Sequence, residues 1–209
     1  MNVPLQDPAF NIRDEPFLLR LKTGTDLHHR QLEAQALLQN LMLPTVTQKQ
    51  YCTYLNLMHQ VLNSYERTIL PLLTEWLPWL IVRPSSILIK QDLEDLHPNG
   101  LQKLPSFNID ASKISLPDAW GFAYVMEGSK LGGKMIEKHI KKTLDIQDNF
   151  GTHYLNGSGL STSTQWKEFL QQLNLYAACN VCEDEVIRGA ILLFTSIHQY
   201  FEINGSQAN

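Results

Sequence analysis

A histidine and a glutamate four residues apart are the side chains in this sequence best placed for chemistry. His29 and Glu33 lie in a stretch of helical periodicity, and residues at i and i+4 share one face of a helix. The carboxylate can then take a hydrogen bond from one imidazole nitrogen, which fixes the other nitrogen as a lone-pair donor. Metal-binding histidines commonly have such a carboxylate partner, although the same pair also occurs on solvated helix surfaces. The spacing therefore makes His29 a candidate metal ligand.

His28 directly precedes this candidate, but on a helix its side chain points about 100° away. It does not share the face of Glu33, so we take His29 as the ligand. The other histidines have no shared spacing with acidic residues, and we expect them to be structural or on the surface: His59, His97, His139, His153 and His198.

Three glycines interrupt a stretch that otherwise favours a helix, residues 118–138. Gly128, Gly132 and Gly133 each cost a helix roughly 0.8–1 kcal/mol relative to alanine. Positions i, i+4 and i+5 share a helix face, so their bare backbone can lie against something broad and flat. This pattern indicates a large planar ligand.

Cys179 and Cys182 form a C-x-x-C motif, which occurs in redox proteins and as half of a zinc site. There is no second pair, and Cys52 is distant in the sequence. We therefore interpret all three as ordinary cysteines of helices. Their odd number also argues against a secreted disulfide framework.

Helices must position these residues, because apolar residues recur at three-to-four spacing and strand signals are nearly absent. We predict an all-α fold, in which Thr45 or Thr47 caps the second helix and Pro117 occupies the first helical position beside Asp118. We also predict a turn over 97–100. The predicted helices cover 17–41, 48–73, 85–96, 117–143, 165–178 and 183–203. The buried side of the first helix is predicted to hold Leu19, Leu27, Leu32, Leu37 and Leu41. The apolar face of the second is predicted to hold Tyr51, Tyr54, Leu55, Met58, Leu62 and Tyr65.

The composition indicates one domain. A chain of 209 residues with 44% apolar content can bury one core, so we expect a single domain over 1–209 with flexible ends at 1–14 and 204–209. A net charge of −4 without a basic stripe makes nucleic acid an unexpected partner. No apolar run reaches the roughly 18–20 residues of a membrane span, and the first residues do not resemble a signal peptide. We expect no membrane association and a cytoplasmic location.

Two blocks resemble a known family. The pattern Leu21-Lys22-x-x-Thr25-x-x-x-His29-x-x-x-Glu33 resembles the proximal helix of the heme oxygenases. The block from Gly121 to Gly133 resembles the distal helix of bacterial, biliverdin-producing members. Two further stretches give support, and the resemblance spans most of the chain: Gly151 to Gly159 with Trp166 to Phe169, and Ala190-x-x-x-Phe194 with Phe201-Glu202.

The resemblance implies a single-domain helical fold with heme between a proximal and a distal helix. On the proximal helix, His29 would be the iron ligand and Glu33 its hydrogen-bond partner. Lys22 would reach a heme propionate, a role for which Arg20, Lys130 and Lys134 are alternatives.

The distal residues implied in catalysis are Gly128, Ser129, Gly132 and Gly133, and Tyr124 is expected to join the glycines in contacting heme. Ser129 stands where mammalian-type members have an aspartate that orders water near the bound oxygen. The proton route would then use water, another side chain or backbone groups.

The implied activity is the opening of heme to biliverdin, carbon monoxide and ferrous iron, with heme as both cofactor and substrate. Dioxygen and an electron-donor protein, such as a ferredoxin or a flavin reductase, would be required. A biliverdin-binding photoreceptor is a further partner that the resemblance allows.

Alternatives remain open at this stage. A non-catalytic heme-binding or heme-trafficking protein on the same scaffold would keep the histidine without turning heme over. Helical enzymes of other classes, such as a thiamin-degrading enzyme or a carboxylate-bridged di-iron oxidase, need a suitable nucleophile or several Glu and His ligands on facing helices. Failure to bind heme would favour those classes.

Overall fold

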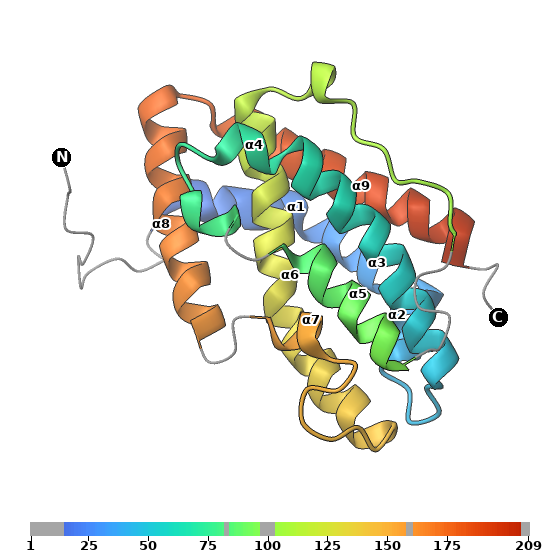
Figure 1. Cartoon of the computed structure of the whole chain (residues 1–209). Coiled ribbons are helices and arrows are strands. Elements are labelled where there is room, and N and C mark those ends of the chain that lie inside the picture. Colours follow the sequence, from blue (N-terminus) through green and yellow to red (C-terminus); the bar gives the residue numbers. More distant parts are fainter. Residues whose placement is uncertain (1–14, 82–83, 97–102, 158–160, 206–209) are drawn as a thin grey trace.

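The computed structural model describes residues 15–81, 84–96, 103–157 and 161–205, and within those ranges it contains helices and no strand (Figure 1). The prediction of an all-α fold is confirmed. The α-helices are α1 Pro16–Glu33, α2 Ala36–Leu41, α3 Gln48–Thr68, α4 Leu70–Leu73, α5 Ser85–Leu96, α6 Leu116–Thr143, α7 His153–Asn156, α8 Thr162–Asn180 and α9 Glu183–Gly205. Short 3-10 helices cover Pro78–Ile81 and Ala111–Lys113. None of the described helices is long and apolar enough to cross a membrane.

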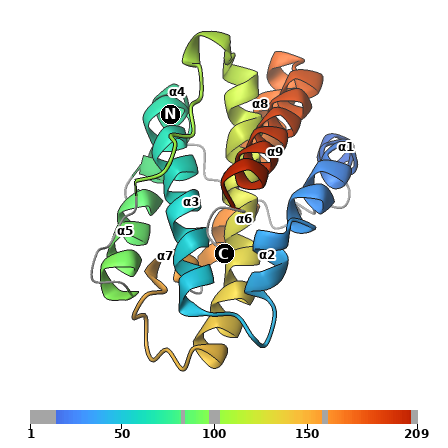
Figure 2. The ribbon, with the colours of Figure 1, turned by 90° about the vertical axis from the view of Figure 1, so that its right-hand side faces the viewer.

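The long helix α6 crosses α9 within the first two turns of each helix (Figures 1 and 2). Glycines allow the close approach: a Cβ atom at Gly121 would lie 2.2 Å from the carbonyl oxygen of Val186. A Cβ atom at Gly189 would lie 2.4 Å from the carbonyl oxygen of Asp118. Both distances are too short for any side chain, so the two backbones touch here because both positions are glycine.

The start of α6 is held by a capping box and an ion pair. The Ser115 hydroxyl accepts the N–H of Asp118, and the Asp118 carboxylate accepts the N–H of Ser115 at 3.1 Å. Arg188 of α9 donates from Nε and Nη2 to the two oxygens of Asp118, each at 3.0 Å. The paired arginine and carboxylate hold the crossing in one register. Pro117 is the second residue of α6, rather than the first as predicted.

The first helix lies along α9 (Figure 2). Arg20 bridges to Glu183 at 2.6 Å and to Asp184 at 2.5 Å. One turn later, a Cβ atom at Gly24 would lie 3.2 Å from the Ile187 side chain. Because α1 and α6 both pack on α9, this last helix sets the position of the two helices that carry the predicted site.

The prediction of one helix over 17–41 was wrong, because the chain breaks between α1 and α2. Gln35 has an extended backbone, with φ −62° and ψ 137°, and its side-chain amide donates to the carbonyl of His198 on α9 at 2.8 Å. The predicted buried side was also partly wrong, since Leu19 and Leu27 are 58% and 62% exposed. The contacts with α9 turn another face inward. The buried residues of α1 are Phe17, Leu18, Leu21 and Thr25.

The predicted helix over 48–73 also divides, into α3 and α4 at Ile69. Pro71 lacks the N–H that would continue the hydrogen-bond ladder of α3. The predicted cap by Thr47 is confirmed, since its hydroxyl accepts the N–H of Gln50. The apolar face predicted for this helix is buried as expected: Tyr51, Tyr54, Leu55, Met58, Leu62 and Tyr65.

Toward the C-terminus, α6 ends at Thr143 as predicted, and α8 begins at Thr162, earlier than predicted. The polar stretch between them contains α7, which the sequence analysis did not predict. The last helix continues to Gly205, and Asn204 is buried with its amide donating to the carbonyl of Tyr200. The predicted flexibility of residues 204 and 205 stays a prediction. The turn predicted at 97–100 and the predicted flexible residues 1–14 and 206–209 lie outside the described residues.

Candidate functional site

His29 lies on α1 with its imidazole half exposed. Its Nδ1 atom lies 3.4 Å from Oε2 of Glu33, four residues further along the helix. The ring also meets Phe194 of α9 edge-on, with centroids 5.6 Å apart. The pairing of Nδ1 with a carboxylate leaves Nε2 as the nitrogen that can bind a metal. The geometry is that expected from the i, i+4 spacing.

His28 differs from His29 in its surroundings. Its Nδ1 atom is buried and has no hydrogen-bond partner among the described residues. No acidic residue in those ranges pairs with it, whereas His29 has Glu33. The structure therefore gives His29, and not His28, the carboxylate partner of a metal-binding histidine.

A hydrogen bond links the two helices of the predicted site. The side chain of Tyr124 on α6 hydrogen-bonds to Thr25, one turn before His29 on α1, and burial raises the pKa of Tyr124. Thr25 is buried and donates its own hydroxyl to the carbonyl of Leu21 at 2.8 Å. The interaction of Tyr124 with Thr25 joins α6 to α1 one turn before His29.

The three glycines of α6 have different surroundings. A Cβ atom at Gly132 would meet no atom within 4 Å. At Gly128 it would lie 3.3 Å from the Trp166 ring of α8, and at Gly133 it would lie 3.7 Å from Leu155 of α7. Gly132 is thus exposed and borders open space, while the other two glycines face protein side chains.

Ser129 is exposed on α6, and its hydroxyl donates to the carbonyl of Met126 at 2.7 Å. A side-chain hydrogen bond also connects it with Tyr154 of α7, and Tyr154 in turn connects with Tyr54 of α3. Burial raises the pKa of Tyr154 well above its ordinary value and that of Tyr54 to about 12. Both tyrosines keep their protons at neutral pH and can donate and accept hydrogen bonds.

A small cavity of about 30 Å³ lies next to Ser129 and Tyr154. Tyr65 and Glu127 also line it. The Tyr65 hydroxyl is buried and has no hydrogen-bond partner among the described residues. A polar space of this size can hold a water molecule, which would satisfy that hydroxyl.

The four cations considered for a propionate are not equivalent. Arg20 is paired with Glu183 and Asp184, and Lys130 with Glu127 at 2.6 Å. Lys134 is near Glu137 at 3.3 Å and donates to Asn156. Lys22 is exposed and has no ion-pair partner in the described part of the chain. It is therefore the cation of the four that remains available for an external carboxylate.

Sequence reasoning missed several residues around the predicted site. Trp166 packs on Tyr124 with ring centroids 5.5 Å apart. Tyr65 and Tyr154 line the small cavity beside Ser129, and Tyr54 interacts with Tyr154. No spacing rule joins these residues, since they come from α3, α7 and α8. The two cysteines of the C-x-x-C motif differ in exposure, since Cys179 is exposed and Cys182 is buried.

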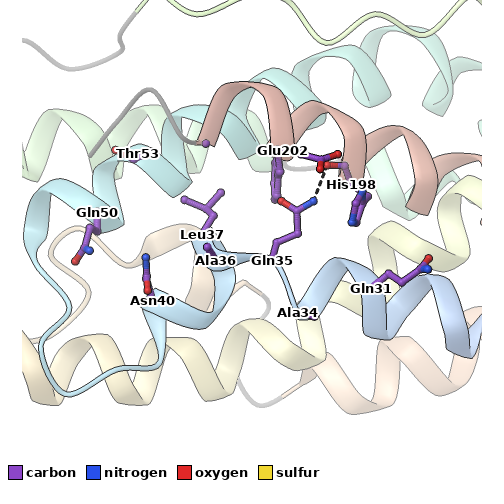
Figure 3. A pocket seen from close by; sticks show the side chains of 12 residues that line it. Gln31, Ala34, Gln35, Ala36, Leu37, Asn40, Gln50, Thr53, His198 and Glu202 are labelled. Carbon is purple, nitrogen blue, oxygen red and sulfur yellow. Dashed lines mark hydrogen bonds between the residues drawn. The ribbon is translucent and has the colours of Figure 1, made fainter.

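A larger cavity of about 450 Å³ lies among α1, α2, α3 and α9 (Figure 3). Gln31, Gln35, Asn40, Gln50 and His198 give it a polar lining, and Gln35 points toward α9. None of the residues predicted to bind heme lines this cavity. It is therefore separate from the predicted site.

Comparison with known proteins shows the family of this chain. The family model described as heme oxygenase matches residues 15–203. The heme oxygenase PigA of Pseudomonas aeruginosa is 31% identical over 100 residues, a match that covers 46% of this chain and 48% of PigA. The chain thus matches about half the length of that relative.

Two solved structures share the fold. The NO- and CO-bound heme oxygenase of Neisseria meningitidis has a TM-score of 0.72 and 24% identity, with 89% of this chain and 92% of that chain covered. The heme oxygenase of Leptospira interrogans has a TM-score of 0.69 and 14% identity, with 90% and 98% covered. At these identities the similarity shows the fold. Since the family model covers nearly all of the described chain, this protein belongs to the heme oxygenase family.

Proposed function

We propose that this chain is a catalytic heme oxygenase that opens heme to biliverdin, carbon monoxide and ferrous iron. The observation that carries the proposal is the pairing of His29 Nδ1 with Glu33 on a half-exposed imidazole. A neutral imidazole oriented in this way is a common iron ligand in heme proteins. Because the chain belongs to the heme oxygenase family, we infer that the iron bound by His29 is that of heme.

The residues fit a bound heme. His29 offers Nε2, and the open space at Gly132 leaves room for a planar group beside α6. Lys22 supplies a cation without a protein partner, which suits a propionate carboxylate. Glu33, Tyr124, Gly128 and Gly133 complete the proposed heme-binding set, with Gly128 and Gly133 setting the positions of Trp166 and Leu155.

When bound, heme supplies the iron at which dioxygen is reduced and the ring that is oxidised. His29 would hold the iron from one side, and Glu33 would orient its imidazole. The bare backbone at Gly132 would leave the other side accessible to dioxygen. Electrons would come from a partner protein, for which a ferredoxin or a flavin reductase is the proposed class.

We propose that protons reach this side through Ser129. Its hydroxyl interacts with Tyr154, which interacts with Tyr54, and the cavity beside them has room for water. The unsatisfied hydroxyl of Tyr65 would hold such a water in place. Hydroxyl groups in series can pass a proton while each keeps its own charge state, which suits tyrosines whose pKa values are raised.

The proposed enzyme would act in the cytoplasm, and its biliverdin would be available to a bilin-binding photoreceptor. The expected partners do not include nucleic acid or a membrane.

Reconstitution tests the catalytic proposal. The purified chain would be loaded with heme and incubated in air with an electron donor, and the products would be separated against biliverdin isomers. Formation of biliverdin with release of carbon monoxide is the expected result. Bound heme that stays unchanged under these conditions would instead identify a heme-binding or trafficking protein on the same fold.

A further inference from the structure

Two aspartates and a histidine form a cluster outside the proposed heme site. Asp92 and Asp95 lie on α5, and His153 is the first residue of α7. One ligand atom from each of the three lies within 4.8 Å of the others. The His153 Nε2 atom is 3.4 Å from Oδ2 of Asp95. The sequence analysis treated His153 as structural or on the surface, because the packing of α5 on α7 is not visible in sequence spacing.

Backbone hydrogen bonds hold the carboxylates in place. Asp92 is fully buried, and its two oxygens accept the N–H groups of His153 at 2.6 Å and Tyr154 at 2.9 Å. Asp95 accepts the N–H of Gly151 at 2.9 Å. Each carboxylate oxygen has two lone pairs, so these bonds leave acceptor capacity for a cation. Hydrogen-bond donors that hold ligand carboxylates in one orientation in this way are typical of metal sites in proteins.

Apart from the His153 ring beside Asp95, the carboxylates of the cluster have no basic partner among the described residues. Neither aspartate has a lysine or arginine partner within the described ranges. The hydroxyl of Thr152, the residue before His153 in the sequence, is buried and has no hydrogen-bond partner among the described residues. A buried carboxylate without a cation is costly, and a bound cation would lower this cost.

We propose that Asp92, Asp95 and His153 bind a divalent first-row transition-metal ion. An imidazole with two carboxylates suits ions such as Zn²⁺, Fe²⁺ and Mn²⁺, while Mg²⁺ and Ca²⁺ prefer oxygen ligands alone. The amide nitrogen of the Gln91 side chain lies 3.0 Å from His153 Nε2, so an ion bound at Nε2 would replace this hydrogen bond.

The ion would join α5 to α7. Tyr154 follows His153 and shares its carboxylate anchor Asp92, so the metal would also hold the residue that interacts with Ser129. Metal binding would therefore stabilise the folded arrangement of α5, α7 and the Ser129 region of α6. Because the ion binds only the assembled cluster, the melting temperature should rise with its concentration.

Titration of the chelator-treated, heme-free chain tests this site. Zn²⁺ is added in a calorimeter, and the expected result is one ion per chain with a raised melting temperature. Co²⁺ added in its place should give a visible absorption band of a nitrogen- and oxygen-ligated ion. Asp95→Asn and His153→Gln should each weaken Zn²⁺ binding about tenfold or more. Mg²⁺ should compete poorly.

Glu94→Gln is the matched control. This neighbour of Asp95 is exposed and pairs with Lys90 at 3.8 Å, so its loss should leave Zn²⁺ affinity unchanged. Circular dichroism establishes that each variant is folded. Absence of Zn²⁺ binding by the folded wild-type chain would overturn the proposal. So would a Zn²⁺ affinity of Asp95→Asn and His153→Gln equal to that of the wild type, or a wild-type affinity for Mg²⁺ equal to that for Zn²⁺. Because heme is absent throughout, failure here is independent of the proposed heme chemistry.

Discussion

The ring of Trp166 lies so close to Gly128 that a Cβ atom at that glycine would stand 3.3 Å from it. A Cβ atom at Gly132, one turn later on the same helix, would meet no atom within 4 Å. The two glycines therefore have separate physical roles. Gly128 admits a neighbouring ring of the protein, and Gly132 leaves space that the protein does not fill.

Gly132→Leu should keep the fold and stop heme turnover. Leucine is a better helix former than glycine by roughly 0.8 kcal/mol, and its Cβ atom would meet no protein atom within 4 Å, so thermal stability should be equal or higher. Its side chain would occupy the space proposed for heme and dioxygen. Thermal unfolding followed by circular dichroism and a bilin assay measure the two effects. Normal biliverdin formation in this variant would rule out the steric role.

Gly189→Ala should destabilise the fold by roughly 1–3 kcal/mol, the usual range for overpacking. The added Cβ atom would lie 2.4 Å from the backbone of Asp118, so α6 and α9 would have to move apart. Denaturant unfolding measures the loss. Gly132→Ala is the matched control and should be neutral or stabilising; equal stability of the two variants would contradict the close crossing of these helices.

Tyr154→Phe should slow turnover roughly tenfold or more while heme still binds, because proton transfer typically contributes at least that much to the rate. The change removes the hydroxyl that interacts with Ser129 and Tyr54. Steady-state rates across pH, with heme affinity measured separately, distinguish a proton role from a binding role. Tyr200→Phe is the control, since its hydroxyl donates instead to the carbonyl of Pro105 at 2.7 Å. Equal rates and pH profiles for wild type and Tyr154→Phe would remove Tyr154 from the proton route.

His59 should make the fold less stable in mild acid. Burial lowers the pKa of this histidine, and the nearby charge of Lys90 lowers it further. The folded state therefore favours the neutral ring, so its stabilising contribution is present above the unfolded pKa of about 6.5 and is lost as the pH falls through the folded value. His59→Gln should reduce the stability lost between neutral pH and about pH 5. Urea unfolding at both pH values measures this difference.

Gln60→Ala changes the adjacent residue without removing a titratable group, and it should lose as much stability in acid as the wild type. If His59→Gln also behaves like the wild type, the neutral state of His59 does not contribute to the pH dependence.

Local geometry could be predicted from the sequence. The His29–Glu33 pair and the cap at Thr47 both depend on residues within one helical turn, whose separation a helix determines. The helix ends at Leu96 and Thr143 follow from local signals of the same kind.

Contacts between distant segments could not be predicted. The break before α2 depends on Gln35 bonding to His198, and the surroundings of Ser129 depend on Tyr154 from a helix of four residues. Such pairings follow from tertiary packing, which overrides local propensity and has no period in the sequence. The metal-ligating role of His29 itself stays a prediction.

The axial ligand of bound heme is the most direct test of the whole account. Resonance Raman and absorption spectra should be recorded for heme-loaded wild type, His29→Ala and His28→Ala. The expected result is loss of the axial histidine signature in His29→Ala and its retention in His28→Ala. Retention in His29→Ala, or loss in His28→Ala alone, would contradict the assignment of His29 as the iron ligand.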